Sequence, residues 1–147
     1  MEHYFSSEPT TKKIETEVSF EVDGVKFDMT AASGTFSSTK LDPGTKVLLS
    51  QTSLLPKDGN VLDLGCGWGP IGIVIATVCP AAKVHAIDIN QRSIEQTRAN
   101  ADRGVGDVCR SPECGPASEH DYDFHRGSTG DEIPGADGGG TARTENL

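Results

Sequence analysis

Apolar and polar residues alternate along the segment VSFEVDGVKFDM, from Val18 to Met29. Alternation with a period of two residues is typical of strands that are buried on one face. The pair Asp23-Gly24 divides the segment and favours a two-residue hairpin turn, because both residue types tolerate positive φ. The sequence therefore predicts a β-hairpin over residues 18–29.

A helix is predicted after the hairpin, with Asp42 as its N-cap and Pro43 at its first position. Apolar residues then recur at a roughly helical spacing and predict one buried face: Val47, Leu48, Leu54 and Leu55. Pro56 and Gly59 end this helix.

Strand and helix patterns alternate from residue 60 to residue 105, which indicates a parallel sheet with crossover helices. The expected elements are a strand at Val61–Leu64, a buried helix at Pro70–Val78, a strand at Lys83–Ile89 and a helix capped by Asn90 that ends near Arg103-Gly104.

Residues 109–147 differ in composition from the rest of the chain. They hold seven Gly and three Pro, while Val, Ile, Leu and Phe are represented only by Phe124, Ile133 and Leu147. Such a segment buries too little apolar surface to offset a chain entropy of ~1–2 kcal/mol per residue. We expect a folded domain over residues 1–108 and a disordered, acidic tail over 109–147.

The charge balance and the apolar runs argue against a nucleic-acid-binding protein of the basic kind and against a membrane protein. The chain has 13 Lys and Arg against 22 Asp and Glu, a net charge of −9, so it lacks the basic excess that drives nucleic-acid binding. The N-terminus has no signal-peptide pattern, and the longest apolar run, Ile71–Cys79, is too short to span a bilayer. We expect a cytoplasmic protein with no membrane partner.

Neither a metal site nor a catalytic residue is indicated by the sequence. The cysteines Cys66, Cys79, Cys109 and Cys114 form no C-x-x-C pair and have no His at zinc-binding spacing. His85 lies in a strand pattern, and the other histidines lie in stretches expected to be terminal or disordered, so none is assigned as a general base.

The stretch VLDLGCGWGPIG, from Val61 to Gly72, places a glycine-rich turn between a strand and a helix. Gly65 and Gly67 permit a sharp turn and close approach of a ligand, and the next helix offers free N–H groups. Asp88 ends the second strand, where a carboxylate accepts hydrogen bonds from ribose hydroxyls. The pattern predicts a nucleoside-containing cofactor.

Two cofactors fit this pattern. Gly67, Gly69 and Gly72 also satisfy the dinucleotide fingerprint G-x-G-x-x-G. Asp63 favours a cofactor with a methionine moiety, because a buried carboxylate attracts an ammonium group and repels a pyrophosphate.

The motifs V-L-D-L-G-C-G-W-G (61–69) and A-I-D-I-N (86–90) resemble those of class I S-adenosylmethionine-dependent methyltransferases. More narrowly, the chain is similar to the methyltransferase small domain group, which includes bacterial guanine-N2 methyltransferases of small-subunit ribosomal RNA. The supporting segments are Glu2–Phe5, Gly34–Ser37, Leu41–Leu49 and Asn90–Ala101. The resemblance covers about residues 1–106 and implies an α/β fold, with an incomplete Rossmann-like methyltransferase sheet behind an N-terminal β-hairpin.

The resemblance also implies S-adenosyl-L-methionine as cofactor, bound by Asp63, Gly65, Cys66, Gly67, Asp88 and Ile89. Residues 65–67 would cradle the methionine part, with Asp63 as a polar anchor acting directly or through water. Asp88 would hold the ribose and Ile89 would contact adenine. Structural alternatives stay open: Asp63 as a cap of a neighbouring turn, and Asp88 as a surface acid before the Asn90 cap.

The sequence departs from the family in its C-terminal part. Amino-directed members carry an Asn/Asp-Pro-Pro-aromatic motif that holds the target amine, and this sequence has no Pro-Pro pair. The resemblance stops near Val105–Val108, so we expect the sheet to lack its third and later strands. A frameshift near Cys109 would explain this.

We therefore expect a truncated methyltransferase that is inactive as it stands. Its ribosomal RNA or small-subunit partner is implied by the resemblance alone. The remaining alternatives are a dinucleotide-binding oxidoreductase fragment and a non-catalytic acidic interaction protein.

Overall fold

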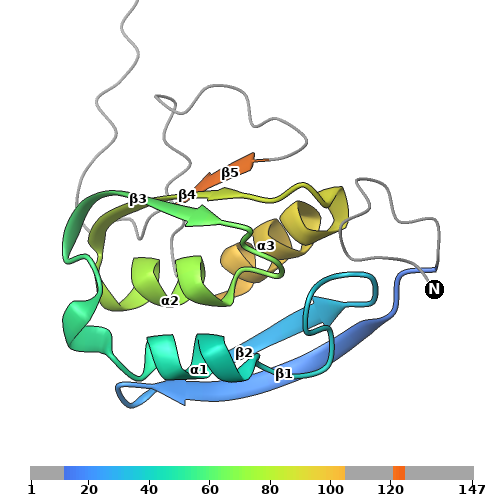
Figure 1. Cartoon of the computed structure of the whole chain (residues 1–147), viewed down its shortest axis with the longest axis horizontal. Helices are drawn as coiled ribbons and strands as arrows, with labels where there is room; N and C mark the ends of the chain where they lie inside the picture. The colour runs from blue at the N-terminus through green and yellow to red at the C-terminus, as the bar shows by residue number, and fades with distance from the viewer. Residues whose placement is uncertain (1–11, 105–120, 125–147) are drawn as a thin grey trace, which may run out of the picture.

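The computed structural model describes residues 12–104 and 121–124 of the chain. The elements are β1 (Glu15–Val22), β2 (Val25–Ala32), α1 (Pro43–Leu49), the 3₁₀ helix η1 (Thr52–Leu54), β3 (Asp58–Leu64), α2 (Pro70–Val78), β4 (Ala81–Ile87), α3 (Gln91–Gly104) and β5 (Asp121–Phe124). Figure 1 shows three layers: the sheet β3-β4-β5, the helices α2 and α3, and beyond them the hairpin β1-β2 with α1. The predicted α/β fold with an N-terminal hairpin is confirmed.

The hairpin is longer than the sequence predicted. β1 and β2 pair antiparallel from Glu15 opposite Ala32 to Val22 opposite Val25. Asp23 and Gly24 have φ of 50° and 76°, so both turn residues take the positive φ that the pair favours. Alternate residues of the two strands are buried: Val18, Val22, Phe27 and Met29. This buried face is what the alternating pattern encodes.

The helix after the hairpin is shorter than predicted. The Asp42 cap is confirmed, because its carboxylate accepts a hydrogen bond from the Thr45 N–H at 3.1 Å. The helix ends at Leu49, however, with Ser50 as its C-cap, and η1 follows, so the apolar spacing changes phase. The predicted face is wrong at three positions that are exposed, namely Val47, Leu48 and Leu54. The fourth predicted position, Leu55, is buried as expected, and Leu49 is buried as well.

The predicted parallel sheet and its crossover helix are confirmed for the first two strands. β3 and β4 pair in parallel, with Val61 opposite Val84 and Leu64 opposite Ile87. The helix α2 between them starts at Pro70, as predicted, and is buried on nearly all sides. β4 ends two residues earlier than predicted, so Asp88 and Ile89 follow the strand rather than belong to it.

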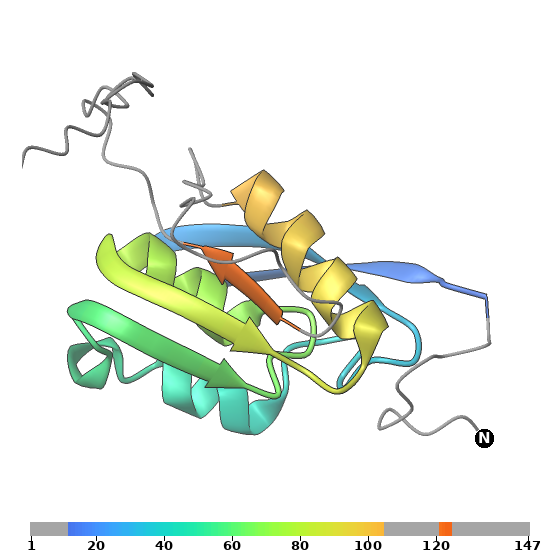
Figure 2. The ribbon, with the colours of Figure 1, turned by 90° about the horizontal axis from the view of Figure 1, so that it is seen from above.

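A third strand, β5, corrects the expectation that the sheet ends after two. It pairs with β4 on the side away from β3, with Val84 opposite Phe124 (Figure 2). This is the third-strand position of a doubly wound sheet, but β5 runs antiparallel to β4. The sequence DYDF alternates over only four residues, too short a run to stand out in a polar segment. The other residues of the predicted disordered tail lie outside the described part of the chain.

The two faces of the sheet differ in cover. α2 and α3 pack against one face, where Asp63 and Val84 are buried. On the opposite face of β3, Leu62 and Leu64 are 57% and 76% exposed. In residues 12–104 and 121–124 no helix covers this second face, which leaves an apolar surface open (Figure 1). None of the described helices is long and apolar enough to cross a bilayer.

Candidate cofactor site

The carboxyl ends of β3 and β4 bring the predicted site residues together. The N–H groups of Gly65 and Cys66 donate to the Ile87 carbonyl oxygen at 2.8 and 3.1 Å, which ties the glycine turn to the end of β4. The Gly67 N–H donates to Asp88 Oδ2 at 2.9 Å. Four of the six predicted residues, Gly65, Cys66, Gly67 and Asp88, are therefore held together here, and Ile89 follows directly after Asp88.

The glycines of the turn serve two different purposes. Gly65, Gly67 and Gly69 have φ of 75°, 60° and 90°, in the left-handed region that favours glycine. A Cβ atom on Gly65 or Gly67 would meet no atom within 4 Å, whereas one on Gly69 would lie 3.0 Å from Ile73 and from Thr97. Gly65 and Gly67 thus border open space that a ligand can enter, and Gly69 permits close packing of α2 and α3.

Most N–H groups of the turn are engaged inside the protein, although the free donors that the sequence predicted were those of the following helix. Gly65, Cys66 and Gly67 donate to the end of β4, and the Gly69 N–H donates to the Cys66 carbonyl at 2.9 Å. In α2 the Gly72 N–H is also occupied. A phosphate group would need such donors. The turn therefore offers a ligand open space and nearby carboxylates rather than a ring of N–H groups.

Asp63 lies on β3 and is only 6% exposed. Its Oδ2 accepts a hydrogen bond from the Gly72 N–H at 2.9 Å, in the first turn of α2. Burial raises the pKa of Asp63, the Gly72 hydrogen bond opposes this, and the charge of Asp88 adds to the increase. Asp63 thus caps a neighbouring turn, which was the structural alternative. Its burial favours action through water over direct contact with a ligand.

Replacing Asp63 with Asn is expected to stabilise the ligand-free chain at pH 7 by roughly 1 kcal/mol. The amide oxygen still accepts from Gly72, but no charge is buried. Folding raises the pKa of Asp63, so between the ordinary and the raised pKa the folded chain holds a proton that the unfolded chain releases. The stability of the wild type therefore falls as the pH rises through this interval. The advantage of Asp63→Asn should therefore shrink towards pH 3.

Urea unfolding of both chains from pH 3 to pH 7 measures this difference. Asp63→Ala is the matched control, since it removes the charge and the acceptor together and should be less stable than Asp63→Asn at every pH. A stability gain of Asp63→Asn that does not change with pH would contradict the assigned pKa direction.

Asp88 is half-buried and has a fixed orientation. Its Oδ2 accepts from the Gly67 N–H, and its Oδ1 accepts from the Asn90 N–H at 2.8 Å. Each carboxylate oxygen can accept a further hydrogen bond, so both remain able to receive a hydroxyl. The predicted Asn90 cap is confirmed by the Arg92 N–H, which donates to Asn90 Oδ1 at 3.0 Å. Ile89 is 61% exposed beside this carboxylate and offers an apolar surface.

Cys66 contributes its backbone rather than its thiol. The side chain is buried, its sulfur lies 3.5 Å from Thr97 Oγ1, and burial raises the pKa of the thiol to about 12. A thiol that stays protonated is neither a nucleophile nor a metal ligand. Across the described residues, no group of three or more His, Cys, Asp and Glu side chains is placed to hold a metal ion.

Sequence reasoning missed the side chains of α3 that hold the turn. Thr97 Oγ1 donates to the Gly67 carbonyl at 3.0 Å, and Asn100 Nδ2 donates to the Trp68 carbonyl at 2.8 Å. Both side chains are buried. Thr97 and Asn100 lie three residues apart, so they share a helix face. The presence of these polar residues on the face of α3 that packs inward was the signal that could have revealed them.

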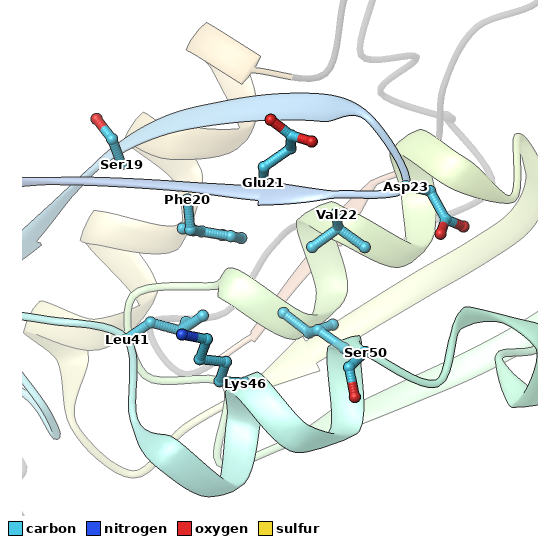
Figure 3. A pocket seen from close by; sticks show the side chains of 9 residues that line it. Ser19, Phe20, Glu21, Val22, Asp23, Leu41, Lys46 and Ser50 are labelled. Atoms are coloured by element: carbon cyan, nitrogen blue, oxygen red, sulfur yellow. The ribbon is translucent and has the colours of Figure 1, made fainter.

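A separate hollow of about 650 Å³ lies between the hairpin and α1. In Figure 3 Phe20 points from the hairpin towards α1 and Lys46 points from α1 towards the hairpin, whereas the Glu21 carboxylate points away from α1. None of the six predicted cofactor residues lines this hollow. It is therefore distinct from the edge formed by β3 and β4.

Residues 26–123 match the family model of the methyltransferase small domain. The chain belongs to this family. The match runs past Gly106, where the resemblance was expected to end, and includes most of β5. It favours a methyltransferase over the dinucleotide-binding and non-catalytic alternatives.

The relatives of the chain are longer proteins. It is 35% identical over 108 residues to the "Uncharacterized protein YbxB" of Bacillus subtilis, covering 73% of this chain and 54% of that protein. It is 47% identical over 66 residues to "Ribosomal RNA small subunit methyltransferase C" of Shewanella sediminis, covering 44% and 18%. It is 30% identical over 96 residues to "Ribosomal RNA large subunit methyltransferase G" of Shewanella putrefaciens, covering 64% and 25%. The chain thus spans about half the length of the first of these relatives and a quarter or less of the other two.

Proposed function

We propose that the carboxyl edge of β3 and β4 binds S-adenosyl-L-methionine. The observation that carries this proposal is the state of the glycine turn, whose N–H groups at Gly65, Cys66 and Gly67 all donate within the protein, close to Asp63 and Asp88. A pyrophosphate would find two negative charges and few donors there. A ligand with an ammonium and a sulfonium group is attracted by the same charges.

Each residue has a defined role in this proposal. The open space at Gly65 and Gly67 admits the methionine part, and Asp63 favours its ammonium group through water. Asp88 accepts hydrogen bonds from the ribose hydroxyls, and Ile89 provides apolar contact for adenine. The bound cofactor supplies an activated methyl group. The protein residues hold and orient it, and none of them is assigned a proton-transfer role.

Replacing Asp88 with Ala is expected to weaken binding of S-adenosylhomocysteine by about 1–3 kcal/mol, the range for charge-assisted hydrogen bonds lost from a partly buried ligand. Isothermal titration calorimetry measures the change. NADH, tested in parallel, should not bind to the wild-type chain.

Asp88→Ala removes the proposed contact to the ribose and also the acceptor of the Gly67 N–H. A ligand control separates these two effects. An S-adenosylhomocysteine analogue without the ribose hydroxyls should bind the wild type and the variant with similar affinity. An equal loss of affinity for both ligands would show that Asp88 only orders the turn and does not hold the ribose.

We further propose that the family activity of this chain is methyl transfer to ribosomal RNA, with guanine N2 as the acceptor. The relatives named as ribosomal RNA methyltransferases support ribosomal RNA as the substrate. Guanine N2 is supported only by the sequence resemblance of segments such as Gly34–Ser37 and Leu41–Leu49. We also propose that residues 1–108 form a truncated methyltransferase domain, to whose sheet β5 adds a strand, and that the chain is inactive as it stands. Its net charge of −9 gives RNA binding no support.

A further inference from the structure

We propose that Asn100 is a positioning residue that fixes the glycine turn against strand β2. This inference rests on the proposed function, because the turn it positions is the proposed cofactor cradle. Asn100 does not belong to the six residues of that cradle. It lies in the last part of α3, is 1% exposed, and acts only through other residues.

The side-chain amide of Asn100 forms four hydrogen bonds. Its Oδ1 accepts from the Thr30 N–H at 2.9 Å and from Thr30 Oγ1 at 3.2 Å. Its Nδ2 donates to the Thr30 carbonyl at 2.7 Å and to the Trp68 carbonyl at 2.8 Å. Four is the full hydrogen-bonding capacity of this amide, so no other orientation of the side chain satisfies the same partners.

Strand β2 supplies the fixed point of this arrangement. Thr30 is paired with Glu17 of β1 on one side, and its N–H and carbonyl groups meet the Asn100 amide on the other. Asn100 therefore acts like one residue of a neighbouring strand. The remaining hydrogen of its amide then reaches the Trp68 carbonyl, which ties the turn to an ordered hairpin 38 residues earlier in the chain.

Thr97 repeats the contact one residue earlier in the turn. Its hydroxyl donates to the Gly67 carbonyl, while Asn100 holds the next carbonyl, that of Trp68. Two consecutive peptide groups, Gly67–Trp68 and Trp68–Gly69, are thus oriented by one face of α3. The peptide group before them carries the Gly67 N–H, which donates to Asp88 of the proposed cofactor site. Loss of either contact to α3 therefore loosens the turn next to that site.

Three variants of the full chain separate positioning from general stability. Asn100→Leu and Thr97→Val each remove a contact to the turn with little change of shape. Gln96→Met is the matched control, because the Gln96 amide donates to Thr30 Oγ1 and makes none of these contacts to the turn. Thr97→Val keeps the inference testable if Asn100→Leu does not fold.

The measurements are amide hydrogen exchange at Gly67 and Gly69 without ligand, affinity for S-adenosylhomocysteine, and Tm. We expect Asn100→Leu and Thr97→Val to raise both exchange rates and the Kd about tenfold. Gln96→Met should leave exchange and Kd unchanged, whatever its effect on Tm. Unchanged exchange at both glycines in the Asn100 and Thr97 variants, or an equal rise with Gln96→Met, would overturn the inference. If the wild type binds no S-adenosylhomocysteine while exchange rises as expected, the proposed function fails and the positioning role stands.

Discussion

The purified 147-residue chain is expected to transfer no measurable methyl group to ribosomal RNA or to small ribosomal subunits. Methyl transfer to an exocyclic amine depends on alignment of the nitrogen with the sulfonium methyl, and orientation contributes ~7–11 kcal/mol to such reactions. The sequence holds no Pro-Pro pair, whereas the amino-directed methyltransferases that it resembles are expected to position the target amine with such a motif. A bound cofactor would therefore face no oriented acceptor.

The described sheet supports the same expectation. A doubly wound sheet places its ligand between strands on both sides of the point where strand order reverses, and here β3 is an edge strand. Leu62 and Leu64 also leave one face of β3 apolar and exposed, which favours association over a stable monomer.

Transfer of radiolabelled methyl groups from S-adenosylmethionine measures this activity. A hybrid in which residues 1–104 are joined to the C-terminal half of a longer relative is the positive control and should recover transfer. Labelling by the 147-residue chain that disappears in Asp63→Ala would show that the described half-site suffices for catalysis.

Much of the fold could be predicted from short-range patterns of the sequence. Asp23-Gly24 fixes the hairpin because two consecutive positive φ values are needed there. Asp42 and Asn90 cap their helices with the hydrogen bonds that these residue types favour. In each case the deciding interaction lies within a few residues, so the sequence alone contains the necessary information.

The misjudged features depend on contacts between distant segments. The exposure of Val47, Leu48 and Leu54 follows from the early end of α1 at Leu49, which no strong local signal marks. β5 is only four residues long and gains its order from pairing with β4.

In the candidate site, too, the sequence predicted the local features and missed the contacts between distant segments. The strand-turn-helix pattern located Asp63, the glycines and Asp88 correctly as neighbours. It could not reveal that the N–H groups of Gly65 and Cys66 are used by the Ile87 carbonyl, or that Thr97 and Asn100 hold the turn from 30 or more residues away. Those contacts require the packing of α3 against the hairpin and the turn.

Replacing Gly69 with Ala is expected to destabilise the chain by roughly 2–5 kcal/mol. A φ of 90° costs a residue with a Cβ atom ~1–2 kcal/mol, by analogy with the left-handed region. The added Cβ would also lie 3.0 Å from Ile73 Cδ1 and from two atoms of Thr97, and overpacking of this kind costs about 1–3 kcal/mol. The two helices that meet at Gly69 would have to separate.

Gly65→Ala is the matched control for Gly69→Ala, because Gly65 has a φ of 75° but a Cβ there meets no atom within 4 Å. It should cost only the backbone strain of ~1–2 kcal/mol. Gly65→Ala should also weaken the binding of S-adenosylhomocysteine, since the added methyl group fills space assigned to the ligand. Urea unfolding at 25 °C compares the two variants. Equal destabilisation by both would mean that Gly69 is needed only for its backbone conformation, and that α2 and α3 do not pack as closely across the turn as the structure shows.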